Sequence, residues 1–278
     1  MNAYKIPIGD AIEALIDFFV TNFSFATKAF SGLTENGIDL LVNLMMLPPP
    51  PVLIAIFAGL AWLLSRQRSI ALFALAGLVL IWNMGLWAPT VSTIALVLIA
   101  TLFAVCTGVP LGILAALNET AHRIITPILD FMQTMPAFVY LIPAIPFFGL
   151  GPVAAIFSTV IFSMPPVIRL TDLGIRQTPK ELVEAADAFG CNRRQKLFKL
   201  QLPIAMPTIM AGINQTIMLA LSMVVIAAMI GAKGLGGEVW KAIQRLQPGR
   251  GFEAGIGIVI VAIILDRIMQ KVGNKAKT

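Results

Sequence analysis

Charged side chains are scarce in this chain. Only 12% of its 278 residues are Asp, Glu, Lys or Arg, and 58% are hydrophobic. The mean hydropathy is +0.88, and a soluble domain carries about 25% charged residues. This composition excludes a soluble globular protein. Because the apolar residues occur in runs long enough to cross a bilayer as helices, it predicts an all-α integral membrane protein.

The groups that carry catalysis are also missing. There is one histidine, His122, and two cysteines, Cys106 and Cys191, without the CxxC spacing of a metal site. We interpret His122 as a solvated residue of a short turn, since an embedded enzyme needs a base and a nucleophile or a metal at depth. No GxxxxGK[ST] phosphate-binding loop is present. The chain is therefore predicted to be no enzyme, to bind no metal and to hydrolyse no ATP itself.

Long apolar runs dominate the rest of the sequence. A helix needs about 20 apolar residues to span the hydrocarbon core. Five runs reach or approach this length, and two weaker candidates bring the predicted number of spans to seven. The fourth, 124–149, contains Asp130, Gln133 and three prolines, so we expect a broken helix there. The seven are 51–65, 69–87, 90–117, 124–149, 152–168, 206–231 and 253–270.

Basic residues orient these spans. With the N-terminus outside, most of the 20 Lys and Arg fall in segments predicted to lie in the cytoplasm. The C-terminus is predicted to lie in the cytoplasm too. The exception is the outer loop 231–252, which holds Lys233, Lys241, Arg245 and Arg250. The net charge of +6 is scattered over loops without a basic tract, which argues against nucleic-acid binding.

The first 50 residues have a different pattern. Asp10, Glu13 and Asp17 alternate with apolar residues at helical spacing. We expect an amphipathic helix at the outer face of a multi-pass cell membrane protein. A scaffold around the bundle is a better interpretation of this extracytoplasmic region, 1–50, than a ligand site.

Polar chemistry is concentrated between Glu184 and Pro203. Good helix formers run from Lys180 to Phe189, Gly190 supplies a break, and Asn192 suits the N-cap of a second helix that ends before Pro203. The sequence predicts a helix-turn-helix in the cytoplasm, within the loop 169–205, where another protein could dock.

The spacing Glu184-Ala185-Ala186, then Gly190, then LQLP ending at Pro203 resembles the EAA loop of permease subunits of ABC importers. The resemblance implies that these residues contact an ATP-binding subunit. They would transmit its closure to the spans, with Arg193 and Arg194 flanking the contact. For the two arginines alone, a solvated loop that obeys the positive-inside rule is the favoured interpretation.

Further segments are similar to permeases of glycine betaine/proline-type osmoprotectant importers, over roughly residues 90–270. They are QTMPAFVYLIPAI (133–145), MPPVIRLTDLGIRQTP (164–179), LPIAMPTIMAGINQTIMLALSMVVIAAMIGAKGLGG (202–237) and GIVIVAIILDRI (257–268). Lys233 departs from the small residue expected before Gly234. This resemblance implies a type I ABC importer permease fold with two peripheral spans in 51–89, a core permease domain in 90–272 and a cytoplasmic tail, 273–278.

The same resemblance implies the partners of the chain. They are ATP-binding subunits, which would hold ATP and Mg²⁺ while this chain holds no cofactor, an extracytoplasmic substrate-binding protein, a second copy of this chain and the membrane lipid. The implied function is to form the translocation path for a compatible solute such as glycine betaine. A permease for an amino acid or a sulfonate is the alternative. An ion-coupled secondary transporter is disfavoured, since the predicted spans hold no Lys or Arg apart from Arg267 near the cytoplasmic end of the last one, and the halves show no repeat.

Polar residues within the spans are candidates for that path. Gln133 and Thr134 lie on the broken span, and Asn214, Gln215 and Thr216 lie on span 206–231. Such groups are costly when they face lipid. They either line the translocation path or form hydrogen bonds between packed helices, and the sequence favours neither. For Asp130, about two helical turns from Arg123, we expect a structural ion pair or cap.

Overall fold

The computed structural model describes residues 8–22 and 24–275, and within these ranges the regular structure is entirely helical. The all-α prediction is therefore confirmed. The elements in chain order are α1 (Ile8–Asn22), α2 (Ser24–Met46), α3 (Pro50–Ser65), α4 (Arg68–Asn83), α5 (Trp87–Leu117), α6 (Glu119–Thr134), η1 (Ala137–Tyr140), α7 (Leu141–Phe148), α8 (Pro152–Ser163), α9 (Pro165–Arg176), α10 (Lys180–Ala188), α11 (Arg193–Lys196), η2 (Leu197–Gln201), α12 (Leu202–Ala227), η3 (Ala228–Ile230), α13 (Leu235–Gln244) and α14 (Pro248–Lys275).

Each of the seven predicted apolar runs coincides with a helix or a pair of helices. Among the described residues, three helices are long and apolar enough to cross a membrane, namely Trp87–Leu117, Pro152–Arg176 and Arg193–Ile230. Two bent pairs raise the number to five if each pair is one span. One pair, Thr27–Met46 with Pro50–Ser65, bends by 103°. The other is the predicted broken span, in which Glu119–Thr134 and Ala137–Phe148 meet at 111°.

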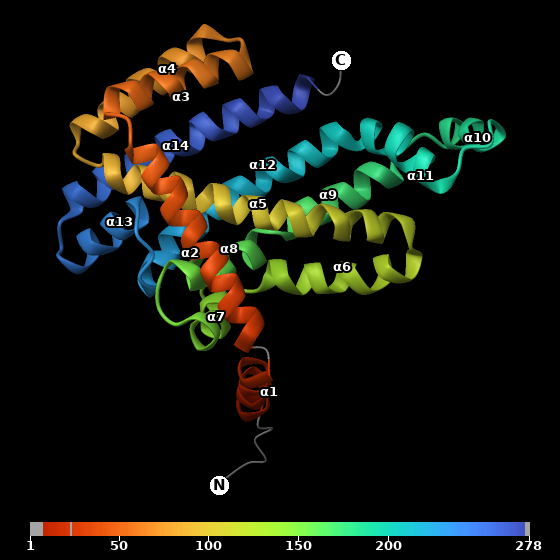
Figure 1. Cartoon of the computed structure of the whole chain (residues 1–278), viewed down its shortest axis with the longest axis horizontal. Helices are drawn as coiled ribbons and strands as arrows, with labels where there is room; N and C mark the ends of the chain where they lie inside the picture. The colour runs from red at the N-terminus through yellow and green to blue at the C-terminus, as the bar shows by residue number, and fades with distance from the viewer. Residues whose placement is uncertain (1–7, 23, 276–278) are drawn as a thin grey trace.

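The long helices α5 and α12 run side by side through the molecule, and the shorter α9 packs against both (Figure 1). Helix α6 returns along them, and the pair α3 and α4 packs with α14 at one edge. The short helices α10 and α11 project at one end of the bundle, while α13 lies at the opposite end. The predicted span 152–168 lies within a longer helical segment, Pro152–Arg176, which continues past residue 168 through Arg169.

Glycines allow α5, α9 and α12 to approach closely. A Cβ atom on Gly112 of α5 would lie 2.6 Å from both the carbonyl oxygen of Ile168 and the Cβ of Thr171 on α9. On α12, a Cβ at Gly212 would lie 3.1 Å from the Cα of Val167. Small residues of this kind mark helix contacts in membranes, where packing and not water exclusion holds helices together.

The N-terminal region packs on the bundle through α2. Phe30 of α2 contacts the rings of Phe103, Phe148 and Phe157 at centroid distances of 5.3, 5.4 and 6.2 Å. Helix α1 exposes apolar side chains, including Ile12 and Leu15. Residues 1–7 of the predicted amphipathic region lie outside the described residues, as do 276–278 of the predicted tail, whose first residues, 273–275, end α14.

We predict that Gly112→Leu destabilises the protein. The leucine would overpack the contact between α5 and α9, and overpacking costs about 1–3 kcal/mol or more. Thermal unfolding of the detergent-purified protein measures the effect. Gly59→Leu is the matched control, since a Cβ there meets no atom within 4 Å. Equal melting temperatures of the two variants would contradict the proposed packing.

Candidate coupling surface and translocation path

The projecting hairpin of α10 and α11 is built by local hydrogen bonds. At the end of α10, the Cys191 N–H donates to the Ala186 carbonyl (3.0 Å) and the Gly190 N–H donates to the Asp187 carbonyl (2.9 Å). This is the Schellman arrangement, which needs a residue with positive φ. Gly190 has φ +74°. The break predicted at Gly190 is confirmed.

A reciprocal cap begins the second half of the hairpin. The Asn192 side chain accepts a hydrogen bond from the Gln195 N–H, and the Gln195 side chain accepts one from the Asn192 N–H, both at 2.9 Å. The predicted N-cap is confirmed. Lys196 Nζ then lies 2.7 Å from Asp187 Oδ1, which joins α11 to α10.

The predicted end of this second helix before Pro203 is wrong. The chain continues from α11 through the π-helical segment η2 into α12, so Arg193–Ile230 is one helix of 38 residues. The Leu202 N–H donates to the Leu197 carbonyl, five residues earlier. The wider π turn leaves room for the ring of Pro203, which has no N–H to contribute and would crowd an ordinary helix.

Most of the predicted coupling residues are exposed on the hairpin. Exposed are Glu184, Ala185, Gly190, Arg193 and Arg194, whereas Ala186 is half-buried. Glu184 also lines a cavity of about 240 Å³ beneath the hairpin, together with Ala116, Ile175, Arg176, Thr178, Lys180, Val183 and Gln201. The motif thus has one side toward solvent and one toward the helices that carry it.

Phe189 was not among the predicted site residues. Its ring is 89% exposed at the tip of the hairpin, directly before Gly190. A large apolar side chain in an otherwise polar loop is a typical feature of a protein-binding surface. The sequence signal that could have identified Phe189 was an aromatic residue directly before the glycine of the predicted turn.

A buried acidic group joins α9 to α6. Asp172 of α9 is only 8% exposed. Its Oδ1 accepts a hydrogen bond from Arg176 Nε at 2.8 Å, and its Oδ2 lies 2.8 Å from His122 Nδ1. The prediction that His122 is a solvated turn residue is therefore wrong, because α6 returns against α9 and brings the ring to Asp172.

Arg176 adds a second contact to α6 and extends this network to α5. Its guanidinium donates to Glu119 of α6 at 3.0 Å and to the Ala115 carbonyl of α5 at 2.9 Å. We define Glu119, His122, Asp172 and Arg176 as the α6–α9 network. Arg176 lies four residues before α10 begins, so the network fixes the base of the hairpin to α5, α6 and α9 together.

A second ion pair joins α6 to α9. Asp130 Oδ1 lies 2.6 Å from the Arg169 guanidinium. The structural role predicted for Asp130 is confirmed, but the expected partner, Arg123, is wrong. Arg123 pairs with Glu119 at 3.5 Å, one turn away on its own helix.

The candidate path residues are only partly brought together. Asn214 and Gln215 line a cavity of about 490 Å³ with Pro207, Thr208, Met210, Ala211, Met269, Gln270 and Gly273. Gln133 and Thr134 do not line this cavity and are exposed at the end of α6, just before the 111° bend. Thr216 is fully buried, and its hydroxyl has no hydrogen-bond partner in the described part of the chain.

Asp266 of α14 was also overlooked. Its carboxylate accepts hydrogen bonds from Asn214 Nδ2 (2.8 Å) and from Gln270 Nε2 (2.7 Å to Oδ2). Asn214 therefore forms a hydrogen bond between two packed helices. This was one of the two roles expected for it from the sequence, the other being to line the translocation path. An acidic residue within an apolar run was the signal for this site.

Residues 108–277 match the family described as the binding-protein-dependent transport system inner membrane component. The chain belongs to this family. It is therefore an inner membrane permease component.

Several relatives align over nearly the whole permease. It is 52% identical over 278 residues to the glycine betaine transport system permease protein OpuAB of Bacillus subtilis, covering 99% of this chain and 97% of that protein. It is 49% identical to the glycine betaine/carnitine transport permease protein GbuB of Listeria monocytogenes, with coverages of 100% and 99%. It is 48% identical to the glycine betaine/proline betaine permease protein ProW of Escherichia coli, with coverages of 98% and 77%.

The fold is that of a solved importer. The permease aligns with a chain of the MetNI methionine ABC transporter, in an inward-facing conformation, with a TM-score of 0.62 and 21% identity. The alignment covers 66% of this chain and 92% of that chain. The type I importer permease fold expected from the sequence is confirmed.

We predict that Asp172→Asn lowers the free energy of unfolding by roughly 1–3 kcal/mol, since it weakens a charge-assisted hydrogen bond of a buried group. Thermal unfolding of the purified permease measures the loss. Glu119→Gln is the matched control in the same network, and its loss should be smaller because Glu119 is exposed. A D172N variant as stable as wild type would show that the network does not hold these helices together.

Proposed function

We propose that this permease forms the translocation path of an ATP-driven importer for glycine betaine or another quaternary ammonium or proline-type osmolyte. The observation that carries the proposal is the identity of about one half, over almost the whole chain, to permeases named for glycine betaine transport. The alignments extend over the segments proposed to line and couple the path and are not confined to the general permease pattern.

A separate binding protein would provide most of the substrate recognition. Tight binding of a quaternary ammonium group is typical of an aromatic cage. The chain has 4 Trp and 2 Tyr, spread along its length. We propose that an extracytoplasmic binding protein captures the osmolyte and that the permease offers a passage of low affinity.

The hairpin would couple this passage to ATP hydrolysis. In the proposed complex, ATP and Mg²⁺ bind to partner ATPase subunits, and Glu184, Ala185, Ala186 and Gly190 seat in a groove of one of them. Arg193 and Arg194 flank that contact, and Phe189 inserts as its apolar anchor. The support is their exposure on a hairpin whose second half continues without interruption into α12.

Closure of the ATPase subunits would then reach the path by two routes. One is the continuous helix Arg193–Ile230, and the other is the α6–α9 network at the base of the hairpin. Two copies of the permease would enclose the path between them. Gln215 and the neighbouring cavity of about 490 Å³ face that path, with Asn214 at its wall.

Gln133, Thr134 and Thr216 are the remaining candidates for the translocation path. Gln133 and Thr134 would line the path beside the bend of the broken span, where irregular backbone is tolerated only next to protein or water. Thr216 would reach the path only after a rotation of α12, because it is buried. The N-terminus lies outside and the hairpin and C-terminus lie in the cytoplasm, as the distribution of basic residues supports.

Uptake into liposomes tests the proposed function. The reconstituted complex, with its ATPase, its binding protein and internal ATP, should accumulate labelled glycine betaine and should not do so without ATP. Taurine and proline are compared in parallel. ATP-dependent uptake of taurine or an amino acid alone would refute the substrate class, and uptake driven by an ion gradient without ATP would refute the importer mechanism.

Phe189→Ala tests the coupling surface. Anchors of protein interfaces cost about 2 kcal/mol or more when truncated. We therefore expect the affinity for the ATPase subunits to fall by roughly 30-fold, and uptake to fall with it. The melting temperature of the permease alone should not change, because the ring is 89% exposed. Phe131→Ala on α6, where the ring is 65% exposed, is the control. Equal binding by both variants would remove Phe189 from the interface.

A further inference from the structure

Two cavities of opposite character adjoin at the end of the bundle away from the hairpin. The first, of about 480 Å³, lies between the turn that joins α4 to α5 and the helices α13 and α14. The second, of about 850 Å³, lies along α13 and α14. Ala242 and Gln247 line both. We call them the basic cavity and the apolar groove.

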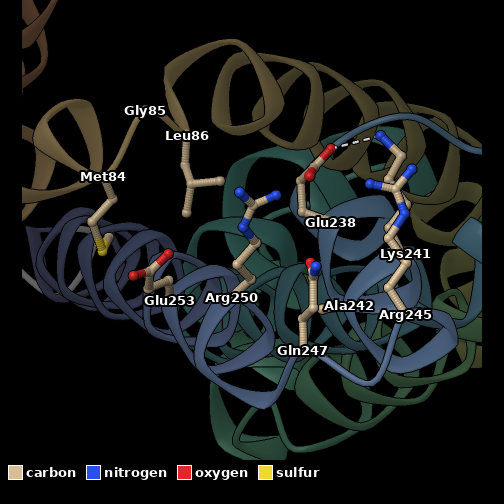
Figure 2. Close-up of a pocket in the computed structure, with 10 residues that line it drawn as sticks. All are labelled: Met84, Gly85, Leu86, Glu238, Lys241, Ala242, Arg245, Gln247, Arg250 and Glu253. Atoms are coloured by element: carbon tan, nitrogen blue, oxygen red, sulfur yellow. Dashed lines mark hydrogen bonds and ion pairs between the residues drawn. The ribbon is translucent and has the colours of Figure 1, made fainter.

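The basic cavity is lined by three cations and two carboxylates, and two of the cations have no ion-pair partner among the described residues. Figure 2 shows the Arg250 guanidinium at its centre, with Glu253 on one side and Glu238 and Lys241 on the other. Lys241 pairs with Glu238 at 2.8 Å. In contrast, the guanidinium groups of Arg245 and Arg250 form no ion pair or hydrogen bond with any described residue.

The apolar groove is lined almost entirely by hydrocarbon. Leu246 is 89% exposed, Phe252 76% and Val259 55%. Leu246 has φ +53°, an uncommon conformation for a non-glycine residue. The chain thus tolerates backbone strain at the turn from which this exposed side chain projects.

The two cavities meet where α14 changes from charged to apolar. Arg250 and Glu253 lie in its first two turns, and Ile256, Val259 and Ile260 follow along the groove. Helix α14 contains the predicted span 253–270. In a membrane-spanning helix, a change from charged to apolar residues marks the level of the lipid head groups. The two cavities therefore suit a ligand with an anionic group at one end and an apolar chain at the other.

We propose that the basic cavity and the apolar groove together bind one anionic phospholipid. Arg245 and Arg250 bind its phosphate, because guanidinium groups form strong paired hydrogen bonds with phosphate oxygens. An acyl chain lies in the groove against Phe252 and Val259. The site accounts for three of the four basic residues of the predicted outer loop 231–252, since Lys241, Arg245 and Arg250 line the basic cavity. These residues otherwise run against the positive-inside rule.

Native mass spectrometry of the delipidated full-length chain in detergent tests the site, with phosphatidylglycerol and phosphatidylcholine of identical acyl chains as probes. We expect one tightly bound phosphatidylglycerol. The double variant R245Q/R250Q should lower its affinity by roughly 10- to 30-fold, since each basic residue near anionic lipid contributes about fivefold. R193Q/R194Q removes the same charge from the hairpin and should leave the affinity unchanged.

Gly255→Phe tests the apolar part separately. A Cβ on Gly255 meets no atom within 4 Å, so the ring would occupy the groove without disturbing the chain. We expect weaker binding of phosphatidylglycerol, with the melting temperature in the absence of lipid unchanged. Wild-type affinity in both R245Q/R250Q and Gly255→Phe would overturn the proposal.

Two further outcomes would assign the cavities to other ligands. Inorganic phosphate or glycerol 3-phosphate that competes with the lipid at equal concentration would show a site for a soluble anion. A cysteine at Val259 that forms a disulfide between two copies, in a chain without Cys106 and Cys191, would show that the groove is a protein interface. Either result would overturn the phospholipid assignment.

Discussion

The close approach of α9 to α5 on one side and to α12 on the other is the contact on which the rest of the structure depends. Inside a bilayer the hydrophobic effect does not favour one helix contact over lipid, so helices must gain their stability from close packing. Gly108 and Gly112 of α5, Gly174 of α9 and Gly212 of α12 make this possible, since a Cβ on any of them would lie within about 3 Å of the facing helix. Helix α9 is thereby fixed along its length, and its position determines where Asp172 and Arg176 lie.

Burial of Asp172 is stable only because its partners are in place. An isolated carboxylate at that depth would be costly, whereas Arg176 and His122 contact both of its oxygens. The same guanidinium contacts Glu119 and the Ala115 carbonyl, so it joins three helices at a single point. The hairpin begins four residues later, so we expect a displacement of its base to act on α5 and α6 through Arg176.

Features that depend on near neighbours could be predicted from the sequence. The positions of the apolar runs, the break at Gly190 and the cap at Asn192 follow from hydropathy, from the φ preference of glycine and from the side chain of asparagine. The partners of His122 and Asp130 could not be predicted, because they lie 50 and 39 residues away on a helix whose rotation the sequence does not reveal. Pro203 was misjudged for a different reason. Proline ends an α-helix by rule, but the preceding π turn accommodates it.

The long helix from Arg193 to Ile230 also explains how a contact at one end of the molecule reaches the other. Beyond η3 the chain turns at Gly231 and enters α13, which is fixed to α5 and α12. The Leu235 N–H donates to Thr93 Oγ1 at 2.8 Å, and a Cβ on Gly236 would lie 2.7 Å from the Val224 carbonyl. Because one helix runs from Arg193 to the turn before α13, we expect a rotation imposed at Arg193 to be transmitted toward these contacts. Lys233, where a small residue was expected, is exposed and lines a separate cavity with Trp240, and it takes no part in the contacts of Leu235 and Gly236.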